Sequence, residues 1–444
     1  MKKYLAAINS DYLVPSVAVA RGISWSHPME TLLKIYHHFM SDSLYRNSIY
    51  LILSTSIQAF FGFFFWIIAA RLYAPEQVGI ATTLISVMTL ISGFSTLGLN
   101  VGLVRFLPKS KEKNEKINSS FFITTLASVV ISIIFLVGLK TFSPKLLFLQ
   151  SNILYMITFT LFVISYSVNA LVESIFVAYR SAKYTLLKNT VLSIVKVVLP
   201  AFLLVFSAYG IYASVGIANI LAFILSIGLL IYNFKYTPKL SLNIPVVKKI
   251  GSYSFANYLA SFLGSLPQML LPLIIVNKLG AKEAAYFYIA LMIASFVYII
   301  PSATTQSLFA EGSNNEKEMR KHINKAIKII TMVLIPVIIF IILFGNYILL
   351  VFGKKYSSEA FMLLRIFAFS SVFISTNYIL STLLRVKNKM KEIIINSLLY
   401  SLFIISAVFL INLKNLYDLG LIWLAAQVFT SAIYYFQLKR IKFS

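Results

Sequence analysis

The chain has 444 residues, of which 59% are hydrophobic and 12% charged, and its mean hydropathy is +0.85. One water-soluble domain cannot bury that much apolar surface, so the composition excludes a soluble globular protein and indicates a membrane protein. The net charge of +25 would suit nucleic acid, but the basic residues lie in alternate loops rather than in one soluble domain, which argues against a nucleic-acid partner.

Residues 1–42 precede the first long apolar stretch, and the first part of them, "MKKYLAAINSDYLVPSVAVARG" (1–22), imitates a secretory signal peptide, because two lysines are followed by apolar residues. Asn9, Asp11 and Pro15 interrupt that apolar region, which a signal peptide does not tolerate. We therefore interpret residues 1–42 as a cytoplasmic N-terminal extension.

Long apolar stretches follow along the rest of the chain. A membrane-crossing helix needs about 20 apolar residues, and the sequence predicts twelve of them: 47–70, 78–100, 118–139, 152–178, 185–206, 210–233, 252–276, 284–308, 326–345, 359–384, 392–411 and 417–437. If the N-terminus is inside, about 29 of the 39 lysines and arginines fall on the inner side. The sequence thus predicts a multi-pass protein of the cytoplasmic (inner) membrane with both termini cytoplasmic.

The sequence contains an internal repeat. The stretch "IIAARLYAPEQVGIATTL" (67–84) returns 207 residues later as "IIVNKLGAKEAAYFYIAL", and a second pair of windows has the same offset. The offset aligns Arg71 with Lys278, Glu76 with Glu283, Ser174 with Ser381, and Asn189 with Asn396. A duplicated six-helix unit has the same orientation in both copies, with an axis along the membrane normal.

The predicted fold class is therefore an all-α polytopic membrane protein with twelve transmembrane helices in two pseudo-symmetric six-helix lobes. The predicted organisation is an N-lobe over 43–234, a cytoplasmic linker over 235–250 and a C-lobe over 251–444. In the outer turn "RLYAPEQ", Pro75 suits the start of a helix and Glu76 complements its dipole. That turn is interpreted as structural.

Helix-breaking residues indicate where the lobes bend or gate. The same offset places Pro301 opposite the residue after Gly93, and Pro267 and Pro272 lie in the seventh span. Corresponding interruptions in two repeats point to a transport site. We expect the first, second, seventh and eighth spans to line the mouth of a central cavity.

Charges inside the spans are the strongest functional candidates, because each costs at least about 2.5 to 3.5 kcal/mol at mid-membrane. Glu173 is the one acid well inside a span, and it can pair with Lys188 for ion coupling or as a structural ion pair. Lys196 lies near the midplane without an acid at its depth, so it is either an anion site or a structural lysine. Arg365 either binds cargo or snorkels to the outer surface.

The same survey argues against an enzyme. The chain has no cysteine, and all four histidines lie outside the spans. No span carries the paired acids of metal or hydrolytic chemistry, and nothing resembles a P-loop. We expect no catalytic residue, metal or cofactor, and the energy would come from an H⁺ or Na⁺ gradient, the membrane potential or the cargo's own gradient.

The stretches "RNSIYLILSTSIQAFFGFFFWIIAARLYAPEQVGIATTLISVMTLISGFSTLGLNVGLVRFLP" (46–108) and "LLVFGKKYSSEAFMLLRIFAFS" (349–370) resemble the Wzx-type polysaccharide flippases. These belong to the multidrug/oligosaccharidyl-lipid/polysaccharide (MOP) exporter superfamily. The resemblance implies alternating access through a cationic cavity that moves a polyprenyl-diphosphate-linked oligosaccharide, such as an O-antigen unit, to the outer leaflet. It also implies polysaccharide polymerases and glycosyltransferases as partners beside membrane lipids. The matching basic positions are Arg46, Arg71, Arg105 and Arg365, to which we add Lys196 for its depth.

Three other interpretations stay open. A MATE-like ion-coupled drug/cation antiporter would be expected to carry acids in its cavity, where this chain carries mostly bases. A membrane glycosyltransferase or polysaccharide polymerase would be expected to display a long catalytic loop, which the short outer loops do not offer. A non-transporting scaffold would not explain a lysine at mid-membrane.

Overall fold

The computed structural model describes residues 43–314 and 318–440, and this part of the chain contains helices and no strands. Twelve helices within these ranges are long and apolar enough to cross a membrane. The predicted fold class is confirmed. Residues 1–42, for which the sequence predicts a cytoplasmic extension, lie outside the described residues.

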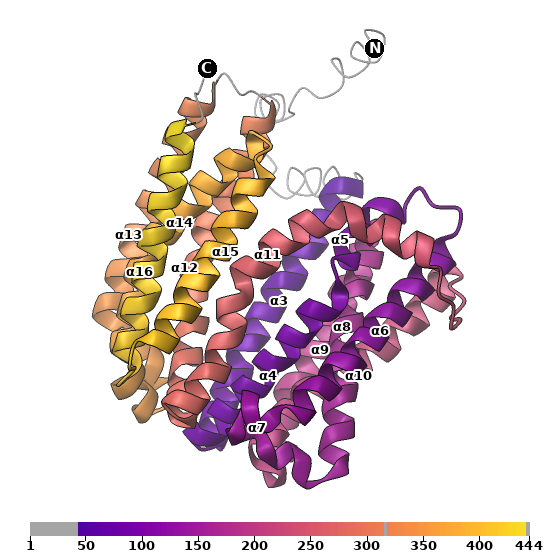
Figure 1. Ribbon diagram of the computed structural model, residues 1–444, viewed down its shortest axis with the longest axis horizontal. Coiled ribbons are helices and arrows are strands. Elements are labelled where there is room, and N and C mark those ends of the chain that lie inside the picture. Colours follow the sequence, from indigo (N-terminus) through magenta and orange to yellow (C-terminus); the bar gives the residue numbers. More distant parts are fainter. Residues whose placement is uncertain (1–42, 315–317, 441–444) are drawn as a thin grey trace, which may run out of the picture.

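The N-lobe contains six long helices and several short ones between them (Figure 1). Its elements are α3 (Ser43–Leu72), α4 (Pro75–Thr96), α5 (Leu99–Phe106), α6 (Lys113–Val137), α7 (Leu139–Phe142), the 3₁₀ helix η2 (Pro144–Ser151), α8 (Ile153–Ala178), α9 (Ala182–Phe202), the 3₁₀ helix η3 (Leu204–Phe206) and α10 (Ser207–Phe234). Within this lobe, α9 packs against both α3 and α10.

The C-lobe consists of six long helices, five of which lie on the left of Figure 1, while the start of α11 reaches across the N-lobe to the right. They are α11 (Ile244–Lys278), α12 (Ala281–Asn314), α13 (Met319–Leu350), α14 (Lys354–Val386), α15 (Met390–Leu410) and α16 (Leu416–Arg440). Helix α14 packs against α12, α13 and α16, and the two lobes meet where α4 contacts α11 and α12.

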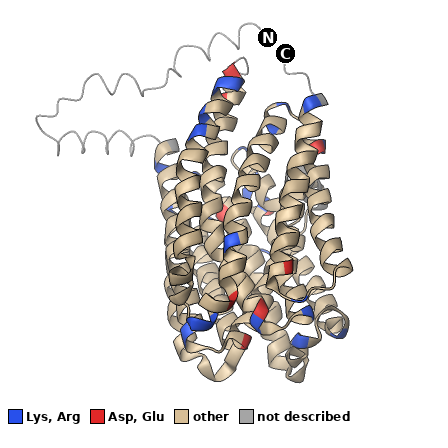
Figure 2. Cartoon of the chain, turned by 90° about the vertical axis from the view of Figure 1, so that its left-hand side faces the viewer, with Lys and Arg blue, Asp and Glu red and all other residues tan. Residues whose placement is uncertain are grey.

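The bundle has two ends that differ in what they carry. We call the end at which α3 begins and α16 ends the terminal end, and the opposite end the distal end. Lysine, arginine and acidic residues gather near both ends, and few lie across the middle of the bundle (Figure 2). This distribution is the one that a membrane-spanning bundle requires, because charge at mid-membrane is costly.

The segment between the lobes is fastened to the N-lobe. The hydroxyl of Tyr236 donates to Asn118 Oδ1 at 2.5 Å, and Asn243 Nδ2 donates to Glu115 Oε1 at 2.6 Å. Burial raises the pKa of Tyr236 to about 12, so its hydroxyl stays protonated and can donate. Helix α11 then begins at Ile244, inside the range 235–250 that the sequence suggests as a linker.

The internal repeat is visible in the hydrogen bonds, with a local shift of one residue. In the N-lobe, Asn169 Nδ2 donates to the backbone oxygen of Asn219 at 2.8 Å. In the C-lobe, Asn377 Nδ2 donates to the backbone oxygen of Gln427 at 3.2 Å. Asn377 lies 208 residues after Asn169, and Gln427 lies 208 residues after Asn219. The repeat therefore has an offset of 208 here, one more than the sequence windows indicate.

The turns after α8 and α14 have the same offset. Arg180 and Asn388 both adopt positive φ, at 53° and 55°, and lie 208 residues apart. In each turn the next residue donates its N–H to a carbonyl five residues earlier, as in a Schellman motif. Helices α9 and α15 each begin two residues after the positive-φ residue, so they keep this register.

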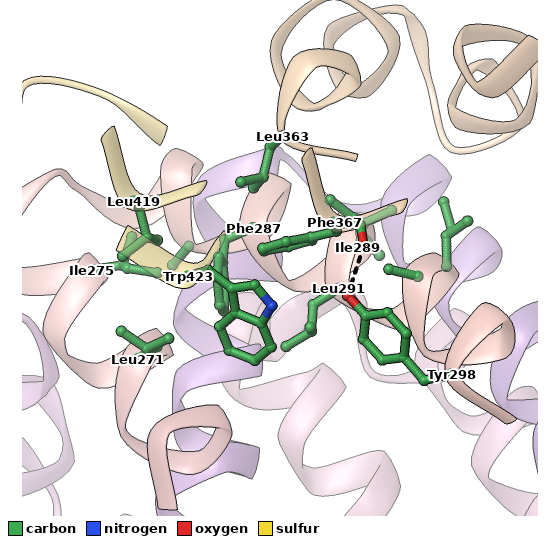
Figure 3. Close-up of a cluster of buried hydrophobic side chains, with 14 of the residues drawn as sticks. Leu271, Ile275, Phe287, Ile289, Leu291, Tyr298, Leu363, Phe367, Leu419 and Trp423 are labelled. Atoms are coloured by element: carbon green, nitrogen blue, oxygen red, sulfur yellow. Dashed lines mark hydrogen bonds between the residues drawn. The ribbon is translucent and has the colours of Figure 1, made fainter. Parts of the chain in front are cut away.

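The C-lobe core is built from aromatic rings on three helices (Figure 3). The rings of Phe287 and Phe367 have centroids 5.8 Å apart, and Phe367 lies 5.4 Å from Trp423. The hydroxyl of Tyr298 donates to the backbone oxygen of Phe367 at 3.1 Å. These contacts join α12, α14 and α16 in one core.

Candidate functional site

Polar side chains join the two lobes at the distal end. Arg71, at the end of α3, donates through Nε to the backbone oxygen of Val351 and through an Nη to that of Leu350, both at 2.8 Å. Glu76 on α4 forms a 3.1 Å ion pair with Lys282 on α12. The sequence-predicted cation Arg71 therefore lies in an inter-lobe seal.

The backbones also approach closely in this seal. A Cβ atom on Gly79 of α4 would lie 1.7 Å from the backbone oxygen of Ala281 at the start of α12. Nearby, Asn277 Nδ2 on α11 donates to Ser143 Oγ of the N-lobe at 3.1 Å. Only glycine permits this approach of α4 to α12, so the lobes are closed against each other at the distal end.

A central cavity of about 550 Å³ lies between the lobes, on the terminal side of this seal. Four helices, α3, α4, α11 and α12, supply all but one of its lining residues. These are the first, second, seventh and eighth spans, as the repeat suggests. The lining residues are Ala59, Gly62, Phe63, Trp66, Ile85, Ser86, Thr89, Lys196, Ser265, Gln268, Met269, Tyr288, Leu291, Met292, Ser295, Phe296 and Ile299.

The central cavity continues into a recess of the N-lobe of about 300 Å³, which we call the N-lobe recess. The two share Trp66, Ile85, Lys196 and Tyr288. The polar side chains of the recess come from α3, α8, α9, α10 and α12, and they are Gln58, Tyr166, Asn169, Glu173, Lys188, Asn189, Lys196, Asn219 and Tyr288.

Glu173 and Lys188 form an ion pair in the N-lobe recess. Lys188 Nζ lies 2.9 Å from Glu173 Oε1, and its side chain is 2% exposed against 41% for Glu173. Asn189 Nδ2 donates to the same carboxylate oxygen at 2.9 Å and to Ser54 Oγ at 2.9 Å. The carboxylate neutralises the buried lysine, and Glu173 lines the recess.

Lys196 lies where the central cavity and the N-lobe recess meet. It is eight residues after Lys188 on α9, or about 12 Å further along the helix axis. Its Nζ lies 5.3 Å from the ring centroid of Phe65. No ion pair joins Lys196 to an acid in the described part of the chain. After Glu173 and Lys188 have neutralised each other, Lys196 is the net positive charge of this wall.

A third cavity of about 400 Å³ lies in the C-lobe, and we call it the C-lobe recess. It shares Ser265 and Gln268 with the central cavity. Its lining comes from α11, α12, α14, α15 and α16 and is rich in amides, hydroxyls and aromatic rings, with Arg385 as its charged residue. Reasoning from intramembrane charge missed this recess, because its polar residues are mostly neutral.

The structure does not bring the remaining predicted cations to Lys196. Arg365 on α14 donates from Nε and Nη2 to the backbone oxygen of Ile342 on α13, at 3.1 and 2.9 Å, and its Cζ lies 4.0 Å from the Phe361 ring. It lines none of the three cavities. Its Nε and Nη2 donate to the backbone of its own lobe, so the structure does not place Arg365 among the residues that line a cavity with Lys196.

Arg46 and Arg105 lie near the terminal end. Arg46 is exposed in the first turn of α3. Arg105 is exposed in the last turn of α5, with its Cζ 5.9 Å from the ring centroid of Phe106. Neither lines any of the three cavities described above, and both are exposed near the terminal end.

The predicted bend residues have different surroundings. Helix α4 runs through Gly93, where a Cβ would lie 2.6 Å from the ring of Phe262 on α11, and the chain turns later, at the positive-φ residues Leu97 and Gly98. Gly93 therefore allows a contact between lobes and does not break α4.

The three prolines lie inside continuous helices. Pro267 and Pro272 are within α11, and Pro301 is within α12. Because Pro267 has no N–H, the carbonyl of Leu263 lacks its helical donor. Ser401 Oγ on α15 donates to that carbonyl instead.

Comparisons with known proteins agree on the family and the fold. The family model described as "Polysaccharide biosynthesis protein" matches residues 68–361. No curated protein sequence matches the chain.

Solved structures of two transporters resemble the chain over most of its length. The lipid II flippase MurJ, in an inward closed conformation, gives a TM-score of 0.71 at 16% identity, covering 88% of this chain and 87% of that one. An inward-facing multidrug resistance MATE family transporter of the MOP superfamily gives 0.69 at 17% identity, covering 88% and 98%.

A third structure is a MOP superfamily transporter from Pyrococcus furiosus Vc1, described by the reverse polarity of its binding pocket. It gives a TM-score of 0.59 at 14% identity and covers 90% of this chain and 95% of that one. At these identities the likenesses establish the fold, which is that of MOP superfamily transporters.

Proposed function

Because the chain belongs to the polysaccharide biosynthesis protein family, we propose that it flips a polyprenyl-diphosphate-linked oligosaccharide between membrane leaflets. The observation that carries the proposal is Lys196, an intramembrane cation without an acidic partner where the central cavity and the N-lobe recess meet. Such a charge favours an anionic cargo, and the diphosphate is the anionic part of this one.

The charge distribution supports an orientation of the chain in the membrane. The terminal end, where most of the basic residues lie in the sequence, is the cytoplasmic side of the inner membrane. The cavity is sealed distally by Arg71, by Gly79 and by the pair of Glu76 with Lys282. The structure then corresponds to the cytoplasm-facing state of an alternating-access cycle.

The energetics require a closable polar cavity. Each sugar hydroxyl costs about 2 to 7 kcal/mol to remove from water without a replacement partner, so several sugars and a diphosphate cannot cross lipid unaided. Arg46 and Arg105 on the cytoplasmic surface attract the diphosphate, and Lys196 holds it in the cavity. An inside-negative potential then favours outward release by about 2.3 kcal/mol per charge per 100 mV.

Glu173 is the candidate ion-coupling group. Its side chain is 41% exposed, so a proton or Na⁺ can reach the carboxylate from the recess. A cation bound there would compete with Lys188 for Glu173 Oε1 and would leave Lys188 free to bind cargo. Polysaccharide polymerases and glycosyltransferases of the same membrane are the expected partners of such a flippase.

The experiment uses the full chain in proteoliposomes with a fluorescent polyprenyl-diphosphate oligosaccharide and a membrane-impermeant reductant. Flipping predicts that the protein increases the fraction of label that the reductant reaches, compared with protein-free vesicles. A parallel assay follows a fluorescent organic cation under H⁺ and Na⁺ gradients. Cation transport without movement of the lipid-linked oligosaccharide would replace this proposal with the drug/cation antiporter.

A further inference from the structure

The N-lobe and C-lobe recesses occupy equivalent places in the repeat. At the offset of 208 that the amide pairs and helix ends define, nine residues of the N-lobe recess have counterparts that line the C-lobe recess. Among them, the ion-pair residues and their neighbour align as Glu173 with Ser381, Lys188 with Asn396, and Asn189 with Ser397. These equivalent positions carry an ion pair in the N-lobe and neutral, hydrogen-bonding side chains in the C-lobe.

Side chains of the C-lobe recess are held in place by one another. Asn377 Nδ2 donates to Gln427 Oε1 at 3.0 Å, and Gln427 Nε2 donates to the hydroxyl of Tyr400 at 3.0 Å. Ser431 Oγ donates to Asn377 Oδ1 at 2.8 Å. Because the Tyr400 hydroxyl is an acceptor in this chain, its own hydrogen is available to a ligand.

The charge of the C-lobe recess decides between kinds of ligand. Arg385 is its charged lining residue, and none of its lining residues is acidic. This composition disfavours a metal or organic cation. The other lining residues include Tyr298, Trp423 and Tyr434, whose rings accompany the amides and hydroxyls. Fixed amides and hydroxyls beside aromatic rings match the alternating polar and C–H surfaces of a sugar ring.

The size and connection of the recess also suit a sugar. Its volume of about 400 Å³ falls within the range of roughly 300 to 1,000 Å³ that is typical of small-molecule pockets. Through Ser265 and Gln268 it opens into the central cavity, which on its other side reaches Lys196. One elongated ligand can therefore lie across both lobes.

We propose that the C-lobe recess binds a sugar unit of the cargo through Asn377, Tyr400 and Gln427, while Lys196 on the opposite lobe holds the diphosphate. This inference rests on the proposed function, because it divides that cargo between the two lobes. The N-lobe then recognises the part that every lipid-linked oligosaccharide shares, and the C-lobe selects among sugars.

The test uses tryptophan fluorescence of the full chain in detergent. The chain has three tryptophans, of which Trp423 lines the C-lobe recess and Trp66 the central cavity and the N-lobe recess. Trp25→Phe with Trp66→Phe leaves Trp423 as the reporter, and Trp25→Phe with Trp423→Phe leaves Trp66. The probes are inorganic pyrophosphate and the methyl glycosides of common hexoses, N-acetylhexosamines and hexuronic acids.

We expect at least one methyl glycoside to shift the Trp423 signal and pyrophosphate to shift the Trp66 signal. Tyr400→Phe keeps the ring and removes one hydroxyl, so it should weaken glycoside binding roughly 2- to 10-fold. The matched control, Tyr166→Phe, removes a hydroxyl from the N-lobe recess and should leave glycoside binding unchanged.

Two results would overturn the inference: no glycoside shifts Trp423 at tens of millimolar, or Tyr400→Phe and Tyr166→Phe bind glycosides equally well. A failure of the proposed function gives a different pattern. In that case pyrophosphate has no effect on Trp66, or Lys196→Met does not reduce its effect, whatever the glycosides do.

Discussion

Replacing Gly79 by alanine places a methyl group between the lobes at the distal end. The added Cβ would lie 1.7 Å from the backbone oxygen of Ala281 and 2.6 Å from its carbonyl carbon. Backbone atoms cannot rotate away as a flexible side chain can, so α4 and α12 must separate there. The substitution therefore acts on the seal and leaves the cavity residues in place.

The magnitude follows from the size of the overlap. Ordinary contact begins near 3.4 Å, so the two atoms must move apart by 1.7 Å. Overpacking of this kind costs about 1 to 3 kcal/mol, and the cost applies only while the distal seal is closed. The ratio of distally open to distally closed molecules should rise roughly 5- to 150-fold.

The assay is distance measurement between spin labels, for which the natural chain is convenient because it has no cysteine. Labels at Lys145 and Lys414 span the distal end, and labels at Lys109 and Lys391 span the terminal end, all four being exposed. Gly79→Ala should lengthen the distal distance and shorten the terminal one.

The matched control is Gly228→Ala on α10, where a Cβ meets nothing within 4 Å. This variant should leave both distance distributions as in the natural chain. If folded Gly79→Ala protein keeps the distal distribution of the natural chain, the seal does not govern opening and the reasoning is refuted.

Three further substitutions separate roles within the site. Glu173→Gln leaves the buried Lys188 without its counter-charge and should cost about 1 to 3 kcal/mol of stability, discounted for the exposure of Glu173, and Glu173→Gln with Lys188→Met should recover part of it. If transport by Glu173→Gln depends on an imposed H⁺ or Na⁺ gradient as transport by the natural chain does, Glu173 is not the coupling group. Arg365→Ala should lower the unfolding temperature, because about 1 to 3 kcal/mol is lost with its bonds to Ile342, while transport per folded molecule stays normal. An unchanged unfolding temperature with reduced transport per folded molecule would place Arg365 in the cargo path. Arg71→Ala removes two inter-lobe hydrogen bonds and should shift the distal label distances toward opening, and unchanged distances would mean that Arg71 does not hold the seal.

The overall architecture was accessible from the sequence because its determinants are periodic and local. Apolar length predicts the spans, and the repeat windows around Arg71 and Lys278 predict two lobes. The pairing of Glu173 with Lys188 was also predictable as one of two alternatives, since a lone acid and a base at similar depth have few other partners in a membrane.

The partners of each cation were not predictable, because they depend on which face of a helix meets which neighbour. Arg71 and Arg365 both donate to backbone carbonyls of segments distant in sequence, and no pattern of side-chain types marks such acceptors. The C-lobe recess, whose polar residues are mostly neutral, was not predicted for a related reason. Asn377 and Gln427 correspond to Asn169 and Asn219 only at an offset of 208, which the sequence windows at 207 conceal.

The most direct test of the central claim compares three lysine variants in the lipid-linked oligosaccharide flipping assay at equal protein levels. Lys196→Met keeps much of the length of the side chain and removes its charge, whereas Lys196→Arg keeps the charge. Lys183→Met, an exposed position on the same helix, is the matched control. We predict that Lys196→Met loses most flipping, that Lys196→Arg keeps part of it, and that Lys183→Met is normal. Flipping by Lys196→Met at the rate of the natural chain would contradict the assignment of Lys196 to the diphosphate.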